Sequence, residues 1–201
     1  MRVVLIALLS ALSSSVYCQK GFKIGIEVDP SWKGNIHHST TTGVWTAENG
    51  YGFSLGVPIK YGWNETNSLN TGLLYEFTSF DQLFKNVLTA SLRISALQLP
   101  VMFNFKLRST WFWSTGAGLN YNFINRGYSY GYYVNINNTV RQLQPWVGLG
   151  IGDQIARDFG LFELGAQARF QFLQLWTKDY AKTQGASSRI LAFDVILRYY
   201  L

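Results

Sequence analysis

Two adjacent histidines are followed directly by a serine, and these residue types could support acyl-transfer chemistry. His37 and His38 are the only histidines of the chain, and Ser39 comes next. A serine hydroxyl becomes a nucleophile when a neighbouring imidazole takes its proton, so the triplet would suit a lipid acyl hydrolase or transferase. A metal site is disfavoured, because adjacent residues of an extended segment point to opposite sides and no third ligand is visible. We therefore expect a solvated loop here, and the sequence predicts no catalytic, metal-binding or cofactor-binding residue.

A glycine-rich run is the second candidate, since closely spaced glycines can cradle phosphate groups. Gly148, Gly150 and Gly152 lie two residues apart, however, within an alternating pattern that no helix pattern follows. Strand residues two apart share one face, so we expect these glycines on a crowded inner wall. The basic residues give a formal charge of +6 but are dispersed along the chain. Attraction to acidic lipopolysaccharide or simple solubility explains this distribution, and we expect no nucleic-acid binding.

The amino terminus has the pattern of a secretory signal peptide. Arg2 precedes an apolar run over residues 3–12, and serines follow it. The run is too short to span a bilayer as a helix. We expect residues 1–18 to be removed after Cys18, so that the domain over 19–201 begins at Gln19. A lipoprotein would keep Cys18 as its acylated first residue, but the bulky Tyr17 before it disfavours that alternative.

Period-two alternation of apolar with small or polar residues dominates the rest of the chain. Between Gly50 and Tyr61 every odd position is apolar or aromatic, and the even positions are small or polar apart from Pro58. The composition, 16% aromatic and only 14% charged, is unusual for a soluble protein. Eight segments with this alternation can be traced: 22–29, 50–61, 69–78, 97–107, 111–123, 143–151, 162–172 and 191–201. The sequence thus predicts an all-β fold, an eight-stranded antiparallel transmembrane β-barrel of the outer-membrane type.

The connections between these segments alternate in length. We expect long ones at 31–49, 79–91, 126–140 and 174–189, and short ones at 62–68, 108–110 and 153–160. Outer-membrane barrels have short periplasmic turns and long outer loops, so the long segments should share the outer face. Aromatic residues gather near both ends of the segments and predict two interfacial girdles: Trp32, Tyr51, Phe77, Tyr121 and Trp176 toward the long loops, and Phe22, Tyr61, Trp63, Trp111 and Tyr199 toward the turns.

Charged residues share the inward parity with the glycines. The cations are Lys23, Lys60, Lys106, Arg169 and Arg198, and the anions are Glu27, Asp29, Glu76, Glu163 and Asp194. Five bulky residues, Leu74, Met102, Phe112, Trp146 and Tyr200, have the same parity. An eight-stranded barrel is only just wide enough for side chains to fill it. We therefore predict a plugged interior with a buried ion network, and a bulge at Pro100, because proline removes a donor from the strand ladder.

Two short segments resemble a known family. The run from Leu97 to Leu107, which contains Leu97-Gln98-Leu99-Pro100, resembles a strand of the PorT-like outer-membrane β-barrel proteins of Bacteroidetes, and Gly21 to Ile26 resembles their first strand. The resemblance implies an eight-stranded barrel in an outer membrane and says little about activity. Two positions depart from the family pattern, since Gln98 replaces an acidic residue and Leu201 replaces the usual terminal phenylalanine.

Three classes of function remain open at this point. The favoured one is a non-enzymatic barrel that acts as a structural, binding or secretion-accessory component in the outer membrane of a Gram-negative cell. Its expected partners are outer-membrane lipids and lipopolysaccharide, the barrel-insertion machinery and secretion-system proteins, and no cofactor is expected. The alternative is a small lipid-modifying enzyme with a site at the outer rim. A soluble ligand-binding barrel is disfavoured, because it would turn its apolar residues inward.

Overall fold

The computed structural model describes residues 21–39, 45–84, 87–107, 110–129, 132–175, 177–178 and 186–201. Only the backbone is described at 35–39, 45–48, 82–84, 87–90, 129, 132 and 186–187. The predicted signal peptide, with Cys18, lies outside these residues. In the part of the chain that is described, no helix is long and apolar enough to cross a membrane.

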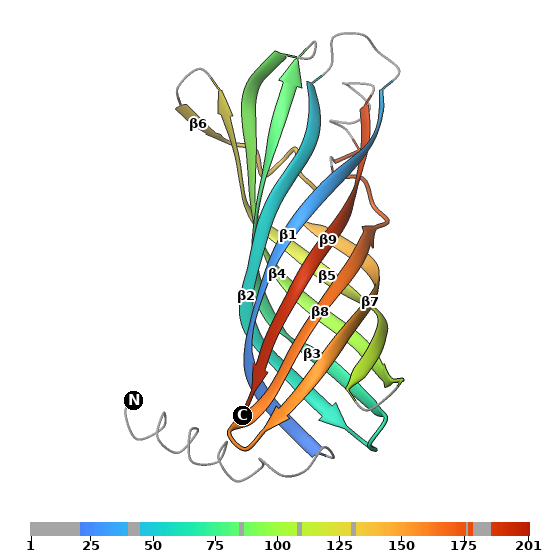
Figure 1. Ribbon diagram of the computed structural model, residues 1–201. Helices are drawn as coiled ribbons and strands as arrows, with labels where there is room; N and C mark the ends of the chain where they lie inside the picture. The colour runs from blue at the N-terminus through green and yellow to red at the C-terminus, as the bar shows by residue number, and fades with distance from the viewer. Residues whose placement is uncertain are drawn as a thin grey trace, which may run out of the picture.

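Eight antiparallel strands close into a barrel (Figure 1), which confirms the predicted fold. Each barrel strand pairs with the next one along the chain, and β9 pairs with β1 to close the barrel. The short β6 is not part of the barrel, because β5 pairs directly with β7 and β6 pairs with β5 alone in the described part of the chain. The strands are β1 (Gly21–Ser39), β2 (Trp45–Gly62), β3 (Asn67–Phe84), β4 (Val87–Lys106), β5 (Trp111–Ser129), β6 (Tyr132–Asn135), β7 (Leu143–Arg157), β8 (Gly160–Gln171) and β9 (Ala186–Tyr200). Gly21, the carboxyl terminus and the short connections at 63–66 and 158–159 lie at one end, which we call the turn end.

The two faces of the wall follow the predicted parity. Leu55 is 50% exposed, whereas Ser54 beside it is 1% exposed. Exposed apolar residues occur on the outer face of each of the eight barrel strands, and most of the buried residues on the inner face are polar or charged. The aromatic residues predicted near the turns, Phe22, Tyr61, Trp63 and Trp111, are exposed on the outer surface. Trp176, predicted for the opposite girdle, lies outside the described residues.

The predicted long loops are in large part strand, and their predicted bounds were wrong. β1 continues to Ser39 and β2 begins at Trp45, and β3 and β4 come within two residues of each other. β5 and β9 also run past β7 and β8, because β7 pairs with β5 only as far as Tyr121 and β8 pairs with β9 only as far as Leu191. We call the segments of β1 to β5 and β9 that lie beyond the ends of β7 and β8 the outer extension (Figure 1). Its two edges are residues 122–129 of β5 and 186–190 of β9.

The alternation of apolar with small or polar residues is lost in the outer extension for a physical reason. The extension lies beyond the ends of β7 and β8, so its strands no longer need one apolar face and one polar face along their whole length. Backbone hydrogen bonds continue the ladder with residues of any type. Register shifts also occur between Ala47 and Gly50, between Gln82 and Leu83, and between Ser95 and Ala96. The last of these exchanges the two faces of β5, where Asn122 is buried on one side of the shift and Asn125 on the other.

The predicted bulge at Pro100 was wrong. Pro100 pairs with Gly118 in the same register as its neighbours, and the shift in this pair of strands is at Ser95 and Ala96 instead. Toward β3, the register places Gly72 opposite Pro100, and the Thr71 hydroxyl donates to the Pro100 carbonyl at 2.8 Å. Gly72 has a φ of +157° and also pairs with Pro58 on its other side. A glycine between two prolines accommodates the lost donor without a slip in register.

Candidate functional site: the barrel lumen

A cluster of four charged side chains crosses the outer half of the lumen. Glu76 of β3 lies at its centre, because its Oε1 contacts Lys33 Nζ at 2.6 Å and Arg169 Nη2 at 2.9 Å. Arg169 also contacts Asp194, with Nε 2.5 Å from Oδ2. The Asn120 amide donates to Glu76 Oε2 at 2.6 Å, and Lys33 donates to the Thr78 hydroxyl at 2.7 Å. The cluster therefore joins β1, β3, β5, β8 and β9 through hydrogen bonds and ion pairs.

A second cluster lies nearer the turn end. Arg198 of β9 contacts Glu27 of β1, with Nε 2.8 Å from Oε2, and reaches Glu163 Oε2 with Nη1 at 3.5 Å. Lys60 of β2 forms an ion pair with the other oxygen of Glu163 across the lumen. The Gln154 amide donates to Glu163 at 2.9 Å. Each carboxylate in this cluster therefore receives at least one charged donor.

The two clusters are electrically balanced and confirm the predicted ion network. Four cations, Lys33, Lys60, Arg169 and Arg198, face four anions, Glu27, Glu76, Glu163 and Asp194, and all eight are buried. Buried charges are costly unless they are paired and hydrogen-bonded, and here they are both. Asp29, also predicted for the network, is buried but forms no ion pair in the described part of the chain.

The position of Lys33 was not predicted, whereas Lys23 and Lys106 face inward as predicted. The sequence placed Lys33 in the first long loop, although it continues the odd inward parity that passes through Glu27 and Asp29. Following that parity past residue 31 would have found it. Lys23 and Lys106 lie at the turn end, where they line a cavity.

Bulky inward side chains fill the space between the charges. All five that were predicted, Leu74, Met102, Phe112, Trp146 and Tyr200, are buried. Glycines opposite them make the room, since a Cβ on Gly118 would lie 2.3 Å from Trp146 Cζ2 and one on Gly152 would lie 2.5 Å from Phe112 Cζ. This packing explains the glycine spacing in β7 as an inner-wall requirement, as predicted.

An apolar plug closes the outer end of the lumen. It consists of six buried residues: Phe80, Leu92, Ile94, Val140, Leu175 and Ile190. Two irregular segments, 136–142 and 172–175, bring Val140 and Leu175 against the strands. Backbone hydrogen bonds hold these segments in place, from Arg141 N to Leu175 O at 2.8 Å and from Leu175 N to Ser188 O at 2.7 Å.

Among the described residues, one small cavity lies between the plug and the first cluster. A cavity of about 10 Å³ is bounded by Lys33 and Glu76 on one side and by Phe80 and Leu175 on the other. That volume is about the smallest that can hold one water molecule. The lumen is thus closed in its outer half by side chains.

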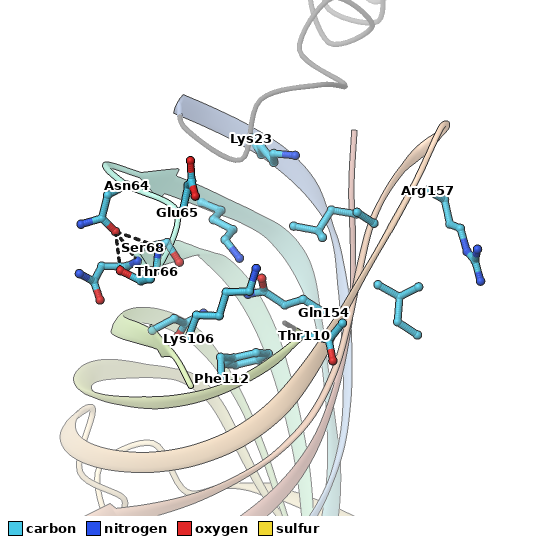
Figure 2. A pocket seen from close by; sticks show the side chains of 16 residues that line it. Lys23, Asn64, Glu65, Thr66, Ser68, Lys106, Thr110, Phe112, Gln154 and Arg157 are labelled. Carbon is cyan, nitrogen blue, oxygen red and sulfur yellow. Dashed lines mark hydrogen bonds between the residues drawn. The ribbon is translucent and has the colours of Figure 1, made fainter. Parts of the chain in front are cut away.

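A larger cavity opens at the turn end (Figure 2). Its volume is about 320 Å³. Lys106, Thr110, Phe112, Gln154 and Arg157 are among the residues that line it (Figure 2). Lys60, which belongs to the second cluster, also lines this cavity.

The candidate nucleophile and its bases lie on a strand. The backbone of β1 pairs His37 with Ser188, His38 with Ser187 and Ser39 with Ala186, so the predicted loop at these positions was wrong. Their side chains lie outside the described residues, and the enzymatic alternative stays a prediction. Among the side chains that are described, no three of histidine, cysteine, aspartate or glutamate lie close enough together to hold a metal ion.

Comparison with known proteins decides the family. Residues 17–184 match the family described as "Outer membrane protein beta-barrel domain". The chain belongs to this outer-membrane barrel family. Its turn end, with the short connections, is therefore the end that faces the periplasm in outer-membrane barrels, and we call it the periplasmic end from here on. No curated protein matches this outer-membrane barrel.

Solved structures share the fold at low sequence identity. The outer membrane protein OprG from Pseudomonas aeruginosa is 8% identical, with 90% of this barrel and 97% of OprG covered and a TM-score of 0.53. Ail, the attachment invasion locus protein of Yersinia pestis, is 13% identical, with 91% and 100% covered and a TM-score of 0.46. Neisserial surface protein A is 12% identical, with 90% and 99% covered and a TM-score of 0.48. At these identities the likeness to OprG indicates the fold and nothing about activity.

Proposed function

We propose that this protein is a non-enzymatic outer-membrane barrel with a closed lumen, which acts through its surfaces as a structural, binding or secretion-accessory component. The observation that carries this proposal is the continuous filling of the lumen. The balanced ion clusters occupy the middle of the barrel, and the apolar plug lies directly beyond them with only about 10 Å³ between. A solute would have to displace both to pass.

The outer extension is the part of the molecule that supports a binding role. The strand β6 pairs with β5 alone and stands away from the barrel (Figure 1). Its residues Tyr133 and Val134 are exposed, and the Tyr133 ring lies 4.8 Å from that of Tyr128 and 5.0 Å from the Arg93 guanidinium. Aromatic and arginine side chains are enriched in protein interfaces. The resemblance to the PorT-like barrels of Bacteroidetes favours a secretion-system protein as the partner, besides lipopolysaccharide and the insertion machinery.

Site-specific crosslinking tests the binding role. A photo-crosslinking residue at Val134 should capture a protein or lipopolysaccharide in native membranes, whereas the same residue at the lipid-facing Leu149 should capture phospholipid. Identical adducts at the two sites, or none at Val134, would contradict a surface role for the outer extension.

The enzymatic alternative has its own test. We expect lipid A from cells that produce the protein to have the same mass as lipid A from cells that lack it. A change in acyl chains that Ser39→Ala abolishes would overturn the non-enzymatic assignment.

We also propose export by the predicted signal peptide. The mature protein in the outer-membrane fraction should begin at Gln19, and amino-terminal sequencing of that fraction tests this. A mature chain that begins with a lipidated Cys18 would establish the lipoprotein alternative instead.

A further inference from the structure

The cavity at the periplasmic end is lined by inward-facing groups of three neighbouring strands. Ser68 of β3, Asn104 of β4 and Ser114 of β5 form one row, because Asn104 pairs in register with both serines. Lys106 follows two residues later on β4, and it pairs with Phe112 of β5. Ser68, Asn104, Lys106 and Phe112 all line the cavity.

Asn104 is the unusual member of this row. The residue is 2% exposed, yet neither Oδ1 nor Nδ2 has a hydrogen-bond partner among the described residues. A buried amide without a partner costs free energy comparable to a lost hydrogen bond, so such groups are rare unless a ligand or water uses them. Asn104 lines a cavity that is large enough for a small solute, and its two amide atoms are buried just behind the surface of that cavity.

The charges around the cavity favour an anion. Lys60 is neutralised by Glu163, but no ion pair to Lys106 is formed within the described ranges. The acidic residue of the lining is Glu65, which is exposed in the connection between β2 and β3 and lies at the rim in Figure 2. An ammonium group inside a barrel wall has restricted access to water, and its field is less screened there than at an open surface.

We propose that this cavity is a binding site for a small soluble molecule that bears a phosphate group. A phosphate offers three acceptor oxygens. The Lys106 ammonium, the Asn104 amide and the Ser68 hydroxyl supply three donors from two strands, and the Thr110 hydroxyl lies at the same cavity (Figure 2). The volume of about 320 Å³ is at the lower end of the range for small-molecule sites. This site goes beyond the closed lumen, because it lies on the periplasmic side of the ion clusters and requires no passage through them.

Titration with inorganic phosphate tests the site directly. The mature chain, refolded in a phosphate-free maltoside detergent, should bind phosphate at constant ionic strength, with a chemical-shift change at the Asn104 side-chain amide. Lys106→Gln and Asn104→Ala should each weaken binding by about tenfold or more, since each removes a donor to a charged group. Ser68→Ala is a smaller change that should weaken binding less and leave folding intact.

Arg189→Gln is the matched control. It removes an exposed positive charge from β9 in the outer extension, at the other end of the barrel from the cavity, so the affinity should stay unchanged. Absence of phosphate binding, or equal loss in Arg189→Gln and Lys106→Gln, would overturn the proposal. Phospholipid nanodiscs distinguish a soluble ligand from a lipid headgroup as the source of the phosphate. If the affinity for inorganic phosphate is the same in nanodiscs as in detergent, the site takes a soluble ligand. A lower affinity in nanodiscs would assign the site to lipid headgroups and overturn the proposal of a soluble ligand.

Discussion

Arg169 of β8 binds Asp194 of β9 through two contacts, Nε to Oδ2 at 2.5 Å and Nη2 to Oδ1 at 2.6 Å. The same guanidinium reaches Glu76 of β3 at 2.9 Å, and β3 is separated from β9 along the wall by β1 and β2. One side chain thus joins two adjacent strands and spans the lumen to a third. Geometry of this kind fixes a guanidinium more firmly than a single contact does.

Loss of the Asp194 carboxylate should destabilise the barrel strongly. Asp194→Asn keeps the shape of the side chain but leaves the buried Arg169 charge with Glu76, which Lys33 already shares. Breaking a buried pair typically costs about 3–5 kcal/mol, and unfolding by denaturant in lipid vesicles would measure it. Asp158→Asn is the control, because Asp158 is exposed in the turn between β7 and β8. Equal stabilities of the two variants would contradict the role assigned to the network.

The two faces of β2 should respond differently to the same arginine. Leu55 and Ser54 are neighbours at the same depth, one toward lipid and one toward the lumen. Leu55→Arg should cost roughly 2–4 kcal/mol if it lies near the bilayer midplane. Ser54→Arg should cost less, because Ser54 pairs in register with Asp29, whose carboxylate can accept the new cation. Comparison of the two unfolding free energies tests the assignment, and the opposite order would reverse the inner and outer faces.

Gly118 should tolerate no larger residue. A Cβ there would lie 2.3 Å from Trp146 Cζ2 and 2.8 Å from the Leu99 carbonyl oxygen. The indole has little freedom to move, since its Nε1 donates to Asn120 at 3.0 Å and the Arg169 guanidinium lies over its ring. Gly118→Ala should therefore destabilise the barrel by about 1–3 kcal/mol. At Gly127 the nearest atom to an added Cβ is 3.7 Å away, so Gly127→Ala should fold like the natural chain, as judged by heat-dependent migration on gels.

The sequence was sufficient to predict the part of the fold that the membrane dictates. Lipid requires one apolar face, so Leu55 and its neighbours alternate visibly, and the inward charges other than Lys33 could be identified by parity alone. Beyond the bilayer this requirement ends, and the extension of β1 past Lys33 carries no comparable signal. The short β6 and the plug residues Val140 and Leu175 belong to that region as well, where long-range contacts decide the structure.

The periplasmic cavity could be predicted only in part. Lys23 and Lys106 were assigned to the lumen from their parity, but their place in the cavity depends on which partners the other charges take. Glu163 binds Arg198 on the adjacent strand and Lys60 across the lumen, and the pairing with Lys60 is a property of strand tilt and register rather than of residue types. The unpartnered state of Asn104 is likewise a result of packing that no sequence pattern reports.

Planar-bilayer recording of the refolded single chain tests the closed lumen most directly. The ion clusters and the apolar plug leave about 10 Å³ between them, so we expect no stable openings above the baseline of the lipid alone at moderate voltage. Large, long-lived single-channel openings from the natural chain would contradict the account and make this barrel a pore.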